Sequence, residues 1–178
     1  MRNLSMHTMG GSVVMNGYHS SANIKKPELN AGFKMTGIGF AHAYKDLNMV
    51  RRMAPIFENL QGNFSGNIKI HTDLDDQMSP VLQTMQGNGS LSTKDLSLSD
   101  VNILNQIADA AGKPDLKNIT VKDMTLDFTI KDGRVATKTF DIKWKDDNLN
   151  LAGSTGLDET IAYTGKINLP ASTGIGKY

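Results

Sequence analysis

Cysteine is absent from this chain of 178 residues. Its absence excludes a disulfide scaffold, a thiol nucleophile and thiolate metal sites, but it does not identify the cellular compartment. No stretch approaches the roughly 20 apolar residues that a helix needs to span a membrane, and the first residues lack the apolar run of a signal peptide. We therefore expect either a cytosolic protein or a piece of a longer exported chain.

An excess of charge of one sign is also missing, because the formal net charge is only +1. Lysine and arginine between residues 113 and 145 are interleaved with aspartate, which is typical of the solvated face of strands. No global field would attract a nucleic acid, and we predict no nucleic-acid partner. The hydrophobic share of 39% and the charged share of 21% are ordinary for a folded domain with a sizeable core.

Catalytic motifs are missing as well. The chain has no Gly-x-Ser-x-Gly turn, no phosphate-binding glycine loop and no helical pair of histidines at metal-binding spacing. Its histidines are scattered: His7, His19, His42 and His71. The adjacent carboxylates Asp75-Asp76 and Asp146-Asp147 stand where helix caps and turns favour aspartate. We predict no enzyme, no metal ion and no cofactor.

The informative part of the chain is residues 121–169, where apolar and polar side chains alternate as in four consecutive strands. The first strand carries one apolar row of Met124, Leu126, Phe128 and Ile130. The pair Asp132-Gly133 predicts a two-residue turn that places Ile130 opposite Val135. The apolar row changes from odd to even positions before Phe140, which predicts a bulge at residues 137–139 that bends the sheet.

The following turns predict two more registers. Two-residue and three-residue loops would place these pairs opposite each other: Trp144 with Leu149, Leu157 with Ile161, Leu151 with Ile167, and Leu149 with Leu169. Gly153 would then face Gly165 on the apolar side and leave a shallow gap. A closely packed helix or a lipid chain could fill that gap.

The N-terminal half mixes strands with helices. Strands are predicted at residues 10–18, 29–40 with a slip at Gly37, 64–70, and 91–98 with a slip near Lys94. A polar loop is expected at 20–27, and helices near residues 44–60 with an interruption at Pro55, near 77–86, and near 100–111 with Ser99 as its N-cap. The predicted fold class is α+β: a curved, mostly antiparallel meander with one apolar face partly covered by amphipathic helices.

Several of these segments together resemble the C-terminal region of AsmA-like proteins. The resemblance covers residues 62–170, through Gly62-Asn63-Phe64-Ser65-Gly66, Gly87-Asn88-Gly89-Ser90-Leu91, Met124-Thr125-Leu126-Asp127-Phe128 and Leu149-Asn150-Leu151-Ala152-Gly153, closing at Leu169-Pro170. The strand at residues 10–18 is similar to a preceding repeat strand of the kind found in Bacteroides-like envelope proteins.

The resemblance implies a place in the Gram-negative cell envelope. Members of the family usually carry an N-terminal transmembrane helix, extend into the periplasm, and belong with TamB-like bridge proteins implicated in phospholipid transfer to the outer membrane and in outer-membrane assembly. This chain would then be a periplasmic piece whose inner-membrane anchor lies in the full-length protein. We expect incomplete N-terminal strands plus a helix at 1–61, the AsmA-like unit at 62–170 packed as one domain with them, and a flexible tail at 171–178.

Two functions remain open at this stage. The first is non-enzymatic handling of phospholipid in a β-groove. Each methylene of an acyl chain that is buried there would contribute about 0.8 kcal/mol to binding. The expected apolar lining of that groove is Phe128, Ile142, Trp144, Leu151, Tyr163 and Ile167. The second is a structural role with a closed core and no lipid, in which the domain binds an envelope protein by adding a strand to an edge near Val14 or Leu169.

Overall fold

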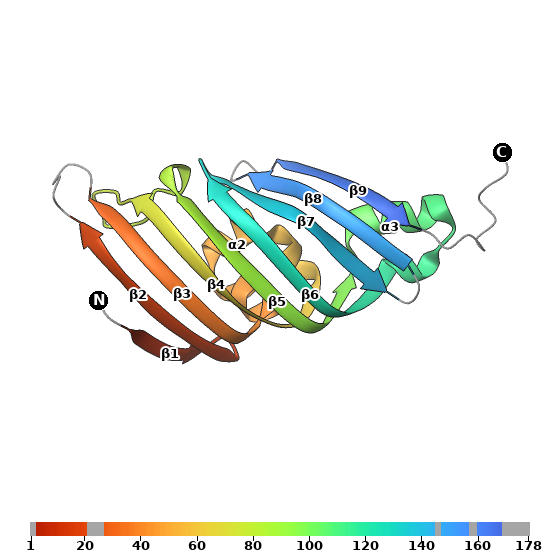
Figure 1. Cartoon of the computed structure of the whole chain (residues 1–178), viewed down its shortest axis with the longest axis horizontal. Coiled ribbons are helices and arrows are strands. Elements are labelled where there is room, and N and C mark those ends of the chain that lie inside the picture. Colours follow the sequence, from red (N-terminus) through yellow and green to blue (C-terminus); the bar gives the residue numbers. More distant parts are fainter. Residues whose placement is uncertain (1–2, 21–26, 145–146, 157–159, 169–178) are drawn as a thin grey trace.

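The computed structural model describes residues 3–20, 27–144, 147–156 and 160–168. Within these ranges the chain forms one antiparallel sheet whose strands lie side by side in chain order (Figure 1). The strands are β1 (Leu4–Thr8), β2 (Gly11–Ser20), β3 (Glu28–Gly39), β4 (Leu60–Asp73), β5 (Gln86–Ser99), β6 (Asn118–Lys131), β7 (Arg134–Trp144), β8 (Asp147–Gly156) and β9 (Ile161–Asn168). No pairing of β9 with β1 occurs in the described ranges, so the sheet is open. The mostly antiparallel β fold predicted from the sequence is confirmed.

The C-terminal meander follows the predicted order but not every predicted register. Ile130 lies opposite Val135, and the β7–β8 pairing shifts between Thr137 and Phe140, so that turn and that bulge are confirmed. The pairing of β6 with β7 ends at Phe128 and Thr137, next to the bulge. Past that point β7 pairs with β8 alone among the described strands, as expected where a bulge turns a strand away.

The predicted registers of β7 with β8 and of β8 with β9 each differ by two residues from the observed ones. Leu149 is opposite Ile142 and Ile167, whereas Trp144 is opposite Asp147. A shift of two residues keeps every side chain on its predicted face, so the alternation of the sequence could not detect the error. The predicted partners Leu157 and Leu169 lie outside the described residues.

The N-terminal strands are confirmed, with one addition. β3 has the expected slip near Gly37, since its pairing with β4 shifts between Met35 and Ile38. The short strand β1 was missed by the sequence analysis, and it covers the edge of β2. Val14 consequently lies between Ser5 and Lys34, so the predicted free edge at Val14 was wrong.

The predicted helix near residues 44–60 is three short pieces that begin earlier: α1 (Phe40–Asp46), α2 (Asn48–Met53) and a 3₁₀ turn, η1 (Pro55–Asn59). Proline at the first position of η1 explains the break, because proline cannot supply the N–H that a continuing helix needs. Phe40, Ala43 and Phe57 are buried against the sheet. Within the described ranges no helix is both long enough and apolar enough to cross a membrane.

The helix predicted near residues 77–86 was wrong. Only a single 3₁₀ turn, η2 (Leu82–Thr84), forms there. The Asp75 carboxylate accepts hydrogen bonds from the backbone N–H groups of Gln77 and Ser79, which closes a loop instead of starting a helix. Met78, with a left-handed φ of 61° and 54% of its surface exposed, stands on that loop.

The third predicted helix is confirmed as α3 (Asn102–Ala111), followed by η3 (Pro114–Lys117). Its N-cap is Val101, without a side-chain hydrogen bond, so Ser99 was the wrong cap and lies in β5. Gly112 ends the helix in the left-handed conformation at φ 63°, which glycine adopts without steric cost. The expected boundary at residues 61 and 62 falls inside β4, which pairs with β3 and with β5.

Helices and sheet meet in two apolar clusters on one face of the sheet. In Figure 1, α2 lies behind the central strands and α3 toward the β7–β9 side. The larger cluster joins residues of α1, η1, α3 and η3 to the strands, and its most deeply buried large members are Ile38, Leu96, Leu116, Ile119, Val121 and Leu149. The smaller cluster contains Ala31, Met53, Ile70, Met85, Phe128 and Ile130. We call this side of the sheet the inner face.

One irregularity crosses three central strands. In β5 the inward positions change from Thr93 to Leu96, and Lys94 and Asp95 between them are both exposed. β6 makes the same change between Met124 and Val121, so the β5–β6 register is kept. Against β4 the register shifts by one residue near Gly62, which has a φ of 119°. The predicted slip near Lys94 is confirmed, with Asp95 at a left-handed φ of 51°.

Candidate functional site

The inner face carries the residues predicted to line a groove, and the register places all six on it. Ile142, Leu149 and Ile167 form one row across β7, β8 and β9. Tyr163 lies opposite Gly153, in the row that leads through Thr137 to Phe128. Leu151 pairs with Phe140 and with Gly165, and Trp144 shares the parity of Ile142. Alternation in the sequence was therefore enough to assign these positions to one face.

Coverage differs among the six residues. Phe128 and Ile142 are 8% and 4% exposed, so they belong to the packed core. Leu151 and Tyr163 are half-buried, and Leu151 packs against the larger cluster. The side chains of Trp144 and Ile167 lie outside the described part of the structure. The predicted lining thus contains both core side chains and partly accessible ones.

The gap predicted between Gly153 and Gly165 does not form, because the observed β8–β9 register does not place these two glycines opposite each other. Each glycine instead faces a larger side chain, and that side chain lies over it. A Cβ added at Gly153 would be 2.5 Å from Cγ of Tyr163, and one added at Gly165 would be 2.8 Å from Cδ2 of Leu151. Phe128 covers Gly89 in the same way, with Cζ 2.5 Å from the position of a Cβ. Large side chains on neighbouring strands therefore fill the space that these glycines leave.

Apolar side chains become accessible toward both edges of the sheet. On β1, Leu4 and Met6 are each 42% exposed, and on β9 Ile161 is 65% exposed. The register places all three on the inner face, opposite Met15, Val13 and Thr155 respectively. Leu4 and Met6 were missed by the sequence analysis. The signal that could have found them is the alternation of Leu4 and Met6 with Val13 and Met15 across the turn at Met9-Gly10.

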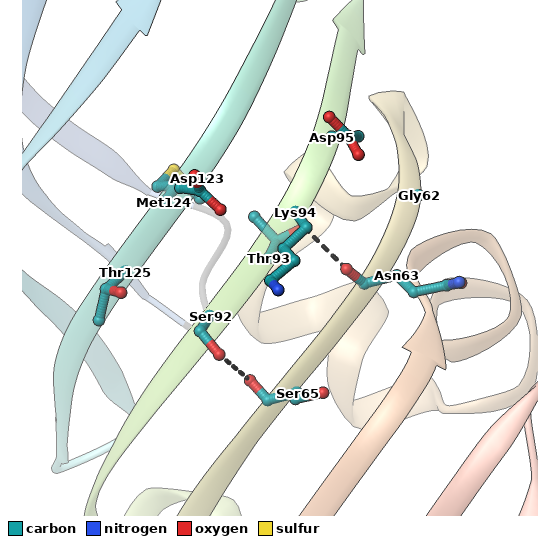
Figure 2. A pocket seen from close by; sticks show the side chains of 10 residues that line it. All are labelled: Gly62, Asn63, Ser65, Ser92, Thr93, Lys94, Asp95, Asp123, Met124 and Thr125. Carbon is teal, nitrogen blue, oxygen red and sulfur yellow. Dashed lines mark hydrogen bonds between the residues drawn. The ribbon is translucent and has the colours of Figure 1, made fainter.

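The outer face is polar, and its hollows are shallow. The irregularity in β4, β5 and β6 leaves a depression of about 550 Å³ (Figure 2). Two of its hydroxyl groups are engaged with backbone: Thr93 donates to the carbonyl oxygen of Asn63 at 2.7 Å, and Ser92 donates to that of Ser65 at 3.3 Å. A second depression of about 580 Å³ includes His71, whose Nδ1 lies 3.1 Å from Oδ1 of Asn30. Neither hollow combines a nucleophile with a base that could activate it.

Ionisable groups do not gather into a reactive cluster in the part of the chain that the structure describes. No three histidine or acidic side chains there lie close enough together to hold a metal ion. Tyr44 on α1 has a pKa above its usual value of 10.0, because it is partly desolvated and donates a hydrogen bond to the nearby Glu58 carboxylate, while Arg51 acts in the opposite direction. This phenol lies in the helical layer, away from both depressions.

Comparisons of the chain with models of protein families, with curated proteins and with solved structures find no match. The AsmA-like resemblance therefore rests on the sequence segments that carry it and stays a prediction.

Proposed function

We propose that the protein is a non-enzymatic component of the cell envelope whose inner sheet face holds acyl chains of phospholipid. The observation that carries the proposal is the unequal coverage of one continuous apolar face. The helices close its centre, while Leu151 and Tyr163 are half-buried and Ile161 is 65% exposed toward β9. Exposed apolar surface next to a packed core is where an apolar ligand gains most by leaving water.

The β7–β9 part of the inner face would form one wall of an acyl-chain site. The bulge near Thr137 turns these strands away from β6, which would give the sheet the curvature of a trough. Each methylene removed from water there contributes about 0.8 kcal/mol. A periplasmic location, a membrane anchor in a longer chain and a part in phospholipid transfer or outer-membrane assembly follow from the AsmA-like resemblance and belong to the same proposal.

The test compares two adjacent, exposed residues on opposite faces of β9. Protein purified without detergent is incubated with phospholipid vesicles and separated from them, and the lipid that stays bound is measured by mass spectrometry of organic extracts. Ile161→Asp places a charge on the inner face and should lower bound phospholipid several-fold. Ala162→Asp places the same charge on the outer face and should leave binding unchanged. Circular dichroism verifies that both variants are folded.

The second candidate is a closed structural domain that binds a partner protein and no lipid. The near-complete burial of Phe128 and Ile142, two of the six expected lining residues, favours it. Absence of bound phospholipid on the folded wild-type protein, or an equal loss in both aspartate variants, would refute the acyl-chain site and leave this alternative.

A further inference from the structure

The outer edge of β1, which no other described strand covers, has no part in the acyl-chain proposal. Of the described strands, β1 pairs with β2 and no other. Leu4 and Met6 are accessible on its inner side. Neither Leu4–Thr8 nor Gly11–Ser20 contains a lysine, arginine, aspartate or glutamate, so this margin of the sheet carries none of these charged side chains.

The turn between β1 and β2 determines which backbone groups point outward. Met9 and Gly10, at φ 53° and 81°, form a two-residue turn of the type that joins antiparallel strands, and Thr8 lies opposite Gly11. The residues that flank such a turn exchange both backbone hydrogen bonds, and the pattern then alternates. Leu4, Met6 and Thr8 therefore bond to β2, while the N–H and C=O groups of Ser5 and His7 point to the free edge.

Apart from its short length of five residues, β1 lacks the features that usually protect an edge strand. It has no proline, no lysine and no charged side chain directed inward, and its pairing with β2 has no bulge. The opposite edge strand, β9, carries Lys166. A regular edge without lysine, arginine, aspartate or glutamate, whose outward N–H and C=O groups are exposed, is suited to pairing with another strand.

We propose that the β1 edge binds β1 of a second copy of this chain, antiparallel and across a two-fold axis at Met6. Met6 is the middle residue of β1, so this register pairs the full length of both strands. It places Ser5 opposite the partner's His7, and each such pair exchanges two backbone hydrogen bonds. It also places Leu4 opposite the partner's Thr8 and Met6 opposite the partner's Met6, all on one side.

We choose a second copy of the chain as the partner because β1 itself offers the regular edge and the outward backbone groups that such pairing needs. Two strands that contain no lysine, arginine, aspartate or glutamate bring no such charges together, and the inner faces of both copies lie on the same side of the joined sheet. Leu4 and Met6 then become interior positions of one continuous apolar layer. The contact is isologous and closes on itself. It is also small, so the dimer is weak and depends on protein concentration.

Cross-linking in a cysteine-free chain provides the test. Met6 of the two copies would form a pair without mutual hydrogen bonds, in which side chains come closest, so Met6→Cys should yield a disulfide-linked dimer under mild oxidation. The matched control is Ile161→Cys, which is also apolar, exposed and on the inner face, but on β9. Dimer should form several-fold faster with Met6→Cys, and a reductant should reverse it. Equal rates would overturn the proposal.

A second variant separates edge pairing from random collision. The N–H of Ser5 points away from β2, so Ser5→Pro removes a group needed by the partner while it leaves the β1–β2 hydrogen bonds intact. In the Met6→Cys background it should abolish the fast cross-linking, and sedimentation should show wild-type dimer but Ser5→Pro monomer at equal concentration. Persistent dimer in folded Ser5→Pro would contradict the proposal. Lipid-free protein is used, so the result is independent of the acyl-chain proposal.

Discussion

The centre of the inner face and its margins follow the same sequence pattern but differ in what covers them. Ile38, Leu96 and Val121 in the central strands are each 1% exposed, whereas Leu4 and Ile161 in the outer strands are 42% and 65% exposed. Alternation assigns all five to one side of the sheet once the changes of parity near Gly37 in β3, near Lys94 in β5 and between Val121 and Met124 in β6 are taken into account. The difference arises from the helical segments, which pack over the centre. Alternation thus identifies a face, and tertiary packing decides how much of it becomes core.

The largest expected effect is at the covered centre. Leu96→Ala removes most of a buried side chain beneath the helical layer, and we expect the free energy of unfolding to fall by about 3 kcal/mol. Urea denaturation measures the change. Lys94→Ala, two residues away and exposed, is the control and should change it by less than about 0.5 kcal/mol. A small effect of Leu96→Ala would show that the central strands are packed no more tightly than the margins.

An intermediate effect is expected where side chains lie over glycine. Gly153→Ala would push a methyl group against the backbone carbonyl of Ala162 and the ring of Tyr163, and overpacking of this kind costs about 2 kcal/mol. In Gly165→Ala the one close contact of the new methyl group is a terminal methyl group of Leu151 at 2.8 Å, which can rotate away, and its other neighbours lie at 3.6 Å. Thermal unfolding should therefore rank the two variants. Equal losses would indicate that Tyr163 is not held over Gly153.

The smallest effect is expected at the accessible margin. Ile161→Ala shortens a side chain that is already 65% exposed, so the free energy of unfolding should change by less than about 0.5 kcal/mol. Denaturant titration of lipid-free protein is the measurement. A loss comparable to that of Leu96→Ala would mean that something covers β9 in solution, and the contrast between centre and margin would then disappear.

Local signals predicted the elements that depend on a single strand or turn. The change of parity before Phe140 located the bulge, and Asp132-Gly133 located the β6–β7 turn. Registers also depend on where each loop begins. Pairs such as Trp144 with Asp147 and Thr155 with Ile161 show that the β7–β8 and β8–β9 loops were each predicted one residue too late, and that displacement moves a register by two residues. The resulting two-residue errors kept every predicted site residue on the correct face while moving its cross-strand partner.

The wrong helix near residues 77–86 came from competition that the sequence does not display. The stripe of Met78, Val81, Leu82 and Met85 has helical spacing, yet the Asp75 carboxylate binds backbone N–H groups within the loop. The Thr72 and Thr84 hydroxyls both donate to the Val81 carbonyl oxygen at 2.9 Å, which fixes the loop to β4. Coverage of Phe128 and Ile142 was equally beyond local patterns, because it depends on where distant helices pack.

Because β5 and β6 share one irregularity, the number of residues in β5 and the number in β6 must match at that point. Lys94 and Asp95 face outward in succession, and so do their cross-strand neighbours Lys122 and Asp123. Deletion of Asp95 alone would either turn Leu96 toward solvent or break the register with β6, whereas removal of Lys122 as well would restore both. Insertions and deletions in related chains should therefore occur at these two positions together, as compensating pairs rather than singly.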